Sequence, residues 1–79
     1  MAEVTLTLFS GPHCGLCDDA LDVVSPLVGD VYRLQIVDVT SSLELKKRYG
    51  LKIPVLYRDD TGEELDWPFD QAQVEAFLS

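Results

Sequence analysis

Residues 9 to 17 read Phe9-Ser10-Gly11-Pro12-His13-Cys14-Gly15-Leu16-Cys17. The residues before this segment, Val4 to Phe9, have the β-branched and apolar composition of a strand, and Ser10-Gly11-Pro12 is a turn cluster. From Cys14 to Val28, apolar residues recur at intervals of three and four, which predicts an amphipathic helix. The cysteine pair is therefore expected where a strand passes into a helix.

The middle of the chain predicts a second strand and a second helix. Residues 31 to 39 are rich in β-branched and apolar side chains, which is typical of a strand covered on both faces in a parallel sheet. A helix is expected from Ser41, where Glu44 completes a capping box, to Gly50, expected as a left-handed residue after the helix end. Pro26 should loosen the last turn of the first helix.

The C-terminal third predicts a hairpin and a last helix. Residues 53–57 and 64–67 flank the turn sequence 59–62 and should pair antiparallel. Asp70 then begins a helix as its N-cap. The expected order is β-α-β-α-β-β-α, a single α/β domain over residues 1–79 in which helices flank a four-stranded mixed sheet.

Composition excludes several classes of function. The 79 residues include 6 Lys+Arg and 14 Asp+Glu, a net charge of -8, which would repel nucleic acid and anionic membranes. No apolar run approaches the roughly 18 to 20 residues of a membrane helix, and the N-terminus lacks the pattern of a signal peptide. We therefore expect a cytoplasmic protein with no nucleic-acid or membrane partner. We also expect it to act as a monomer.

Cys14 and Cys17 are the candidate catalytic residues. Free backbone N–H groups and the positive dipole end at a helix start stabilise a thiolate, so Cys14 is expected to be the more acidic thiol and the nucleophile. Cys17, one turn later on the same side, is expected to resolve a mixed disulfide. A zinc half-site and a pair of inert core thiols stay open as alternatives. Zinc needs four ligands, however, and the only further nitrogen or sulfur donor is His13, which is badly placed, so we expect no metal.

Charged neighbours are expected to tune the pKa of Cys14. Asp18 and Asp19 should raise it by charge repulsion, and His13 would lower it as a cation, although an exposed loop histidine is the simpler interpretation. Lys46-Lys47-Arg48 complements the negative end of the second helix, with a docking patch for an acidic partner as the alternative.

The segment 9–17, the following second helix and Ile53-Pro54 before a hairpin together resemble the thioredoxin fold in its short glutaredoxin-like form, over nearly the full chain. The resemblance implies that Pro54 is a cis-proline facing the dithiol and that Ile53 and Pro54 form a substrate platform. The sequence also allows a trans Pro54 that merely starts a strand. The implied activity is that of a dithiol oxidoreductase that needs no cofactor, acts on protein or small-molecule disulfides, and is reduced by a thioredoxin-like or other dithiol.

The sequence departs from glutaredoxins where they hold glutathione. Glutaredoxins usually carry a Gly-Gly pair and then an acidic residue before the last helix, whereas here Trp67-Pro68-Phe69 precedes Asp70. Asp70 matches the acidic position, a candidate substrate-binding residue, although an N-cap is the simpler interpretation. Many glutaredoxins also have basic residues near the dithiol, where this chain has Asp18 and Asp19. We therefore expect weak use of glutathione.

Two other functions stay open at this point. The domain would be a non-catalytic redox-sensing or interaction module if its disulfide switched a partner surface instead of reducing substrates. It would be an iron–sulfur or zinc carrier if Cys14 supplied ligands across a dimer. Turnover with a dithiol reductant separates the first alternative from an enzyme, and the metal content of freshly isolated protein tests the second.

Overall fold

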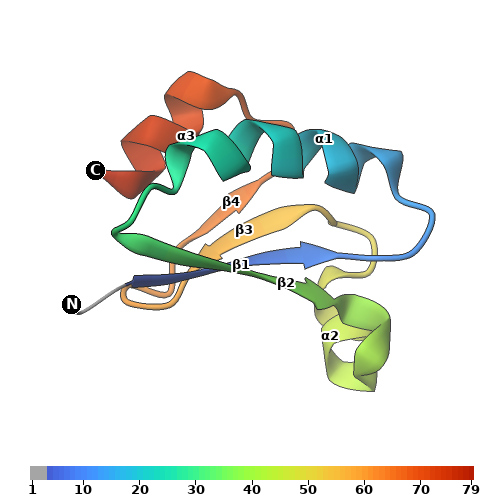
Figure 1. Cartoon of the computed structure of the whole chain (residues 1–79). Coiled ribbons are helices and arrows are strands. Elements are labelled where there is room, and N and C mark those ends of the chain that lie inside the picture. Colours follow the sequence, from blue (N-terminus) through green and yellow to red (C-terminus); the bar gives the residue numbers. More distant parts are fainter. Residues whose placement is uncertain (1–3) are drawn as a thin grey trace.

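The computed structural model describes residues 4–79, which form a four-stranded sheet and three α-helices (Figure 1). The strands are β1 (Val4–Ser10), β2 (Tyr32–Asp38), β3 (Val55–Arg58) and β4 (Glu64–Asp66). The helices are α1 (Gly15–Val24), α2 (Leu43–Tyr49) and α3 (Gln71–Leu78), and two short 3-10 turns, η1 (Ser25–Leu27) and η2 (Val39–Ser41), follow α1 and β2. The predicted order of elements is confirmed.

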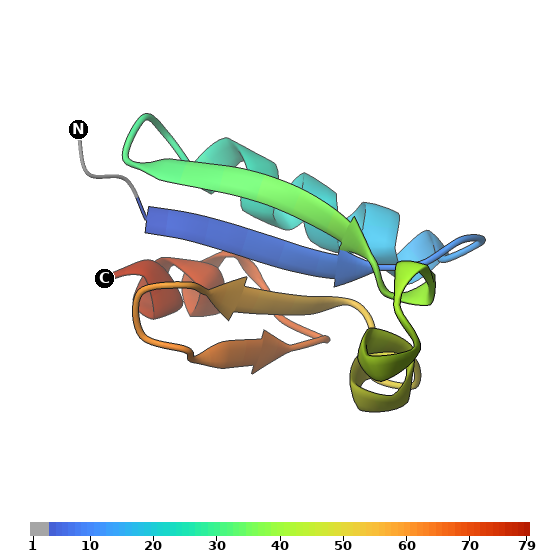
Figure 2. The same cartoon turned by 90° about the horizontal axis from the view of Figure 1, so that it is seen from below.

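The sheet is mixed, with the strand order β2-β1-β3-β4 visible in Figure 2. β1 and β2 are parallel, whereas β3 is antiparallel to both β1 and β4. The hairpin between β3 and β4 closes at Gly62, which has a φ of 76° and donates its N–H to the carbonyl of Arg58 at 2.8 Å. The antiparallel pairing expected from the turn sequence is therefore confirmed.

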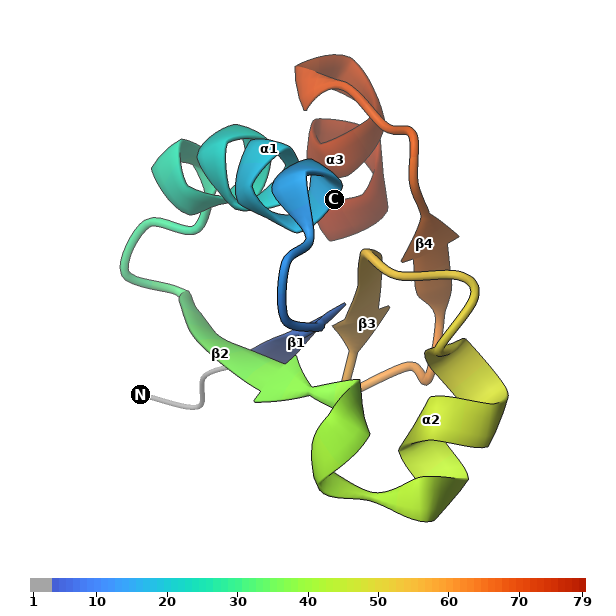
Figure 3. The same cartoon turned by 90° about the vertical axis from the view of Figure 1, so that its right-hand side faces the viewer.

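Helices cover the two faces of the sheet unequally. α1 and α3 lie over one face, whereas α2 covers only one end of the other (Figures 1 and 3). Side chains alternate along β1, so that the strand supplies both cores. The larger core, under α1 and α3, contains Leu6, Leu8, Ala20, Val24, Leu56, Phe69 and Val74. The smaller core, under α2, contains Phe9, Val39, Tyr49 and Val55.

Local signals at two helix ends are confirmed. α1 ends at Val24 and continues as a 3-10 turn through Pro26, which has no N–H to donate to an α-helical bond. The Asp70 carboxylate accepts the N–H of Gln73 at 2.9 Å, and the Gln73 side chain accepts the N–H of Asp70 at 3.0 Å. This reciprocal capping box begins α3 at the expected residue.

The expectation that the second strand is covered on both faces is wrong. Among residues 4–79, β2 lies at the edge of the sheet and pairs only with β1, and its Ile36 is 54% exposed. Strand order depends on which strands pair across the chain, and an apolar composition does not distinguish a central strand from an edge strand.

The expected ends of the second helix are also wrong. Ser41 belongs to η2, and Ser42 is the N-cap of α2, where its hydroxyl accepts the N–H of Leu45 at 3.4 Å. The capping box of Ser41 and Glu44 therefore does not form. Gly50 has a φ of -54° and is not left-handed, because it continues the helical hydrogen bonding by donating its N–H to the carbonyl of Lys46 at 2.9 Å. Among residues 4–79, no helix has the length and apolar content needed to cross a membrane.

Candidate redox site

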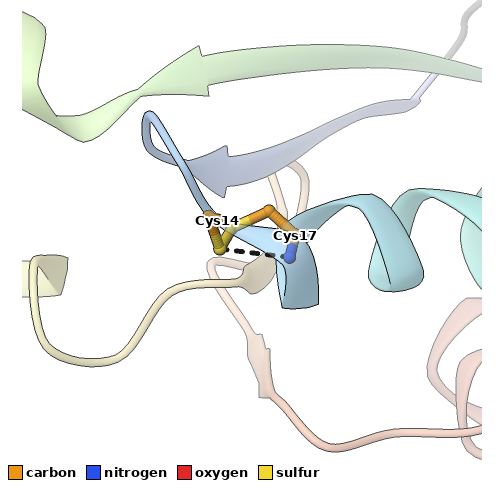
Figure 4. Close-up of a disulfide and its surroundings, with 2 residues drawn as sticks. All are labelled: Cys14 and Cys17. Carbon is orange, nitrogen blue, oxygen red and sulfur yellow. Dashed lines mark hydrogen bonds between the residues drawn. A yellow bond between two sulfur atoms is a disulfide. The ribbon is translucent and has the colours of Figure 1, made fainter.

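Cys14 begins α1 as its N-cap. Its backbone is extended, with a φ of -109° and a ψ of 96°, and its Sγ accepts the N–H of Cys17 at 3.1 Å (Figure 4). A sulfur here does what the side-chain oxygen of serine or aspartate does at an ordinary N-cap, which is to accept a free N–H of the first turn. The helix start therefore supplies both a hydrogen bond and a positive dipole end to this sulfur.

Cys14 and Cys17 are joined by a disulfide, and their Cα atoms lie 5.3 Å apart. This separation is within the usual range of about 4.4 to 6.8 Å for disulfides. The two sulfurs differ in access, because Cys14 is half-buried whereas Cys17 is only 4% exposed. An incoming molecule therefore meets Cys14 first.

The Ile53-Pro54 loop contacts the turn that leads to the dithiol. The peptide bond between Ile53 and Pro54 is cis, so the trans alternative is wrong for this structure, and Pro54 is fully buried. A Cβ atom built on Gly11 would lie only 2.8 Å from Cδ1 of Ile53, so the Ile53 side chain lies directly against the backbone at Gly11. The fold thus brings together two segments that lie about forty residues apart in the sequence.

The geometry agrees with comparisons to known proteins. A family model described as a glutaredoxin-like domain (DUF836) matches residues 5–79. The chain belongs to this glutaredoxin-like family. A comparison with curated proteins finds no significant match.

Solved structures with the same fold include proteins from three organisms. The X-ray structure of XcR50 from X. campestris has 37% sequence identity and a TM-score of 0.79 over 92% of this chain and 93% of that one. A mutant thioredoxin from Halobacterium salinarum has 25% identity and a TM-score of 0.75 over 96% of this chain and 72% of that one. Ne2328 from Nitrosomonas europaea has 21% identity and a TM-score of 0.81 over 100% of this chain and 95% of that one, which shows the fold alone. The glutaredoxin-like domain therefore has a thioredoxin-like fold.

The charged residues expected to act near the dithiol lie at the surface of the glutaredoxin-like domain. Asp18 lies in the first turn of α1, and both it and Asp19 are exposed. His13 is exposed in the preceding turn and has a φ of 57°. Asp70 is the N-cap of α3, so its carboxylate has a structural partner, and its role toward glutathione stays a prediction. Effects of these residues on Cys14 also remain predictions.

Tyr49 packs against β1 and also holds the loop that carries Ile53 and Pro54. The sequence pattern does not predict this role. The Tyr49 ring stacks on Phe9 near the end of β1, with centroids 4.2 Å apart. Its carbonyl accepts the N–H groups of Lys52 and Ile53 at 2.8 and 3.0 Å, and its hydroxyl donates to Glu64 of β4. Burial, followed by the hydrogen bond to Glu64, raises the pKa of Tyr49 to about 12. The spacing of Leu45 and Tyr49, one helical turn apart, was the only sequence signal for this buried face.

Proposed function

We propose that this glutaredoxin-like domain is an enzyme, a dithiol thiol–disulfide oxidoreductase with Cys14 as nucleophile and Cys17 as resolving thiol. The observation that carries the proposal is the asymmetric disulfide at the start of α1. Its outer sulfur accepts a backbone N–H and is accessible, whereas its inner sulfur is buried one turn away. Two inert core thiols would be expected to be buried to a similar extent, without this difference in access and hydrogen bonding.

The reaction begins with the reduced pair. The Cys14 thiolate attacks a substrate disulfide, so that a bond forms between Cys14 and one substrate sulfur while the substrate S–S bond breaks, and the departing thiolate takes a proton from water. Cys17 then loses its proton and attacks the Cys14 sulfur, which releases the second substrate thiol and closes the Cys14–Cys17 disulfide. Two electrons pass from the dithiol to the substrate, and a thioredoxin-like or other dithiol reductant restores the starting state.

The loop carrying Ile53 and Pro54 is the proposed substrate platform. Support comes from the contact of Ile53 with Gly11, which places this loop against the turn that leads to Cys14. Pro54 directly precedes β3, so the loop is anchored to the centre of the sheet. A substrate chain lying along the loop would present its disulfide to the exposed side of Cys14.

We further propose that the enzyme needs no bound cofactor, uses glutathione weakly, and acts as a monomer on protein or small-molecule disulfides. It resides in the cytoplasm, where thiols are kept reduced and an exchange enzyme has a supply of electrons. Its net charge of -8 supports the expectation that neither nucleic acid nor a membrane surface is its partner.

Turnover of a protein disulfide with a dithiol reductant tests the function. The wild type should turn over repeatedly, Cys14→Ser should form no mixed disulfide, and Cys17→Ser should accumulate one between Cys14 and the substrate. A wild-type protein that changes redox state but shows no turnover would be a redox-sensing module. Stoichiometric iron, sulfide or zinc in freshly isolated protein, lost in Cys14→Ser, would instead identify a carrier.

A further inference from the structure

The cations of this acidic protein are concentrated at one corner. Lys46, Lys47 and Arg48 lie in the last turn of α2, and Lys52 follows in the loop that leads to Pro54. These residues are four of the 6 Lys+Arg in the chain, and none of the 14 Asp+Glu lies between residues 46 and 52. The segment from Lys46 to Lys52 is therefore positively charged in a protein whose net charge is -8, although Lys52 lies beside two carboxylates of β4.

Three of these four cations form no ion pair among residues 4–79, and one of the three lies over an aromatic ring. Lys52 lies 3.9 Å from Glu64 and 3.8 Å from Asp66, and Arg48 lies over the ring of Tyr49 at 5.9 Å from its centroid. Lys46 and Lys47 are exposed and form no ion pair within the described part of the chain. Their charge is thus available to an outside molecule.

Exposed leucines flank the two lysines. Residues 43, 46, 47 and 50 follow the i, i+3, i+4, i+7 spacing of one helix face, opposite to the half-buried Leu45 and the buried Tyr49. Leu43 is 71% exposed, and Leu51, just after the helix, is fully exposed at 104%. We call Leu43, Lys46, Lys47 and Leu51 the α2 outer face. It combines two free positive charges with apolar side chains that contribute nothing to the core.

The α2 outer face is joined to the candidate redox site. Leu51 lies two residues before Ile53, which contacts Gly11 of the turn that leads to the dithiol. The loop between them is held at the end of α2, because Tyr49 accepts the N–H groups of both Lys52 and Ile53. Figure 1 shows α2 and the turn before α1 at the same end of the sheet.

We propose that the α2 outer face docks an acidic, leucine-bearing segment of a protein substrate while the disulfide of that substrate reacts at Cys14. The proposal rests on the dithiol function proposed above and specifies its substrate class. Charge complementarity to Lys46 and Lys47 selects the acidic segment, and Leu43 and Leu51 offer apolar surface to bury. Asp18 and Asp19 on α1 repel the same segment, so that the opposite charges of the two helices orient the substrate.

Single-turnover reduction of two matched peptides tests this docking. Each peptide carries one cysteine as a mixed disulfide with a fluorescent thiol and one leucine, and the remaining residues are glutamates in one peptide and lysines in the other. At about 0.15 M salt, where the screening length is about 8 Å, the repulsion from the net charge is weakened and contact interactions dominate. Pre-reduced wild-type protein should react about fivefold faster with the acidic peptide.

Two charge reversals provide the matched comparison. Lys47→Glu should abolish the preference for the acidic peptide. Arg33→Glu makes the same change in net charge at an exposed position near the start of β2, at the other end of the sheet from α2, and should preserve the preference. Equal rates for the two peptides, or equal losses in the two variants, would overturn the proposal.

A binding measurement separates failure of docking from failure of the dithiol function. If neither peptide is reduced, the oxidoreductase function is wrong, and fluorescence anisotropy of the same peptides with the oxidised protein then decides the docking. Tighter binding of the acidic peptide that is lost in Lys47→Glu supports the α2 outer face. Equal binding of the two peptides overturns it.

Discussion

The two cysteines differ in access although they share one disulfide. Cys14 is half-buried at the start of α1, and Cys17 is almost fully buried one turn deeper. In the reduced protein, limiting iodoacetamide should therefore label Cys14 at least about tenfold faster than Cys17. Peptide mapping by mass spectrometry gives the ratio, and preferential labelling of Cys17 would reverse the assigned roles.

The reactivity of Cys14 should also depend on the carboxylates beside it. We expect its place at the N-cap to stabilise the Cys14 thiolate of the reduced protein, and we expect the carboxylates of Asp18 and Asp19 to destabilise it. An Asp18→Asn, Asp19→Asn variant should have a lower Cys14 pKa and about threefold faster alkylation at neutral pH, measured by thiolate absorbance and by rate. An Asp22→Asn, Asp30→Asn variant is the matched control, because it makes the same change in net charge at exposed positions. Its Cys14 pKa and alkylation rate should change little. Equal shifts in the two variants would show that only net charge matters.

Helix α2 is short and is attached to the sheet largely through Tyr49. The tyrosine hydroxyl donates to Glu64, so Tyr49→Phe should lower the free energy of unfolding by about 1 to 2 kcal/mol at neutral pH. Tyr57→Phe is the matched control, because its ring also lies beside Phe9 while its hydroxyl forms no hydrogen bond within residues 4–79. Denaturant unfolding should show a loss below about 0.5 kcal/mol for this control.

The Tyr49 hydroxyl also predicts a pH dependence of the attachment of α2. Its pKa is raised from 10.0 to about 12, so the folded state favours the protonated hydroxyl. The resulting stabilisation is fully present below the unfolded pKa near 10 and is lost as the pH rises through about 12. The stability difference between wild type and Tyr49→Phe should therefore shrink over this interval, and parallel curves would contradict the role of the hydroxyl.

We expect the charge and the packing of the whole molecule both to disfavour glutathione. The net charge of -8 repels an anionic tripeptide at long range, and Trp67 packs edge-to-face on buried Phe69 where glutaredoxins usually have glycines. Reduction of a glutathione mixed disulfide should be about tenfold slower with glutathione as donor than with thioredoxin. Higher salt should accelerate the glutathione reaction, because screening weakens the repulsion. Equal rates with the two donors would contradict this expectation.

Most local features of this protein were predictable from short windows of sequence. The cysteine pair at a strand-to-helix junction, the interruption at Pro26, the hairpin and the Asp70 cap depend on residues within a few positions of one another. Their physical causes are equally local: helical hydrogen bonds between neighbouring turns, the missing N–H of proline, and the backbone freedom of glycine in a turn. The shift of the α2 cap from Ser41 to Ser42 shows the limit, because both serines satisfy the same local rule.

Tertiary packing determined what joins distant segments. The edge position of β2 follows from which strands pair with β1, and the contact of Ile53 with Gly11 follows from β1 and β3 being neighbours in the sheet. The stacking of Tyr49 on Phe9 and its hydrogen bond to Glu64 form only when α2 packs against the sheet. Such contacts form where burial of the whole apolar surface is most favourable, and the free energy of that burial depends on all the elements together rather than on any single window of the chain.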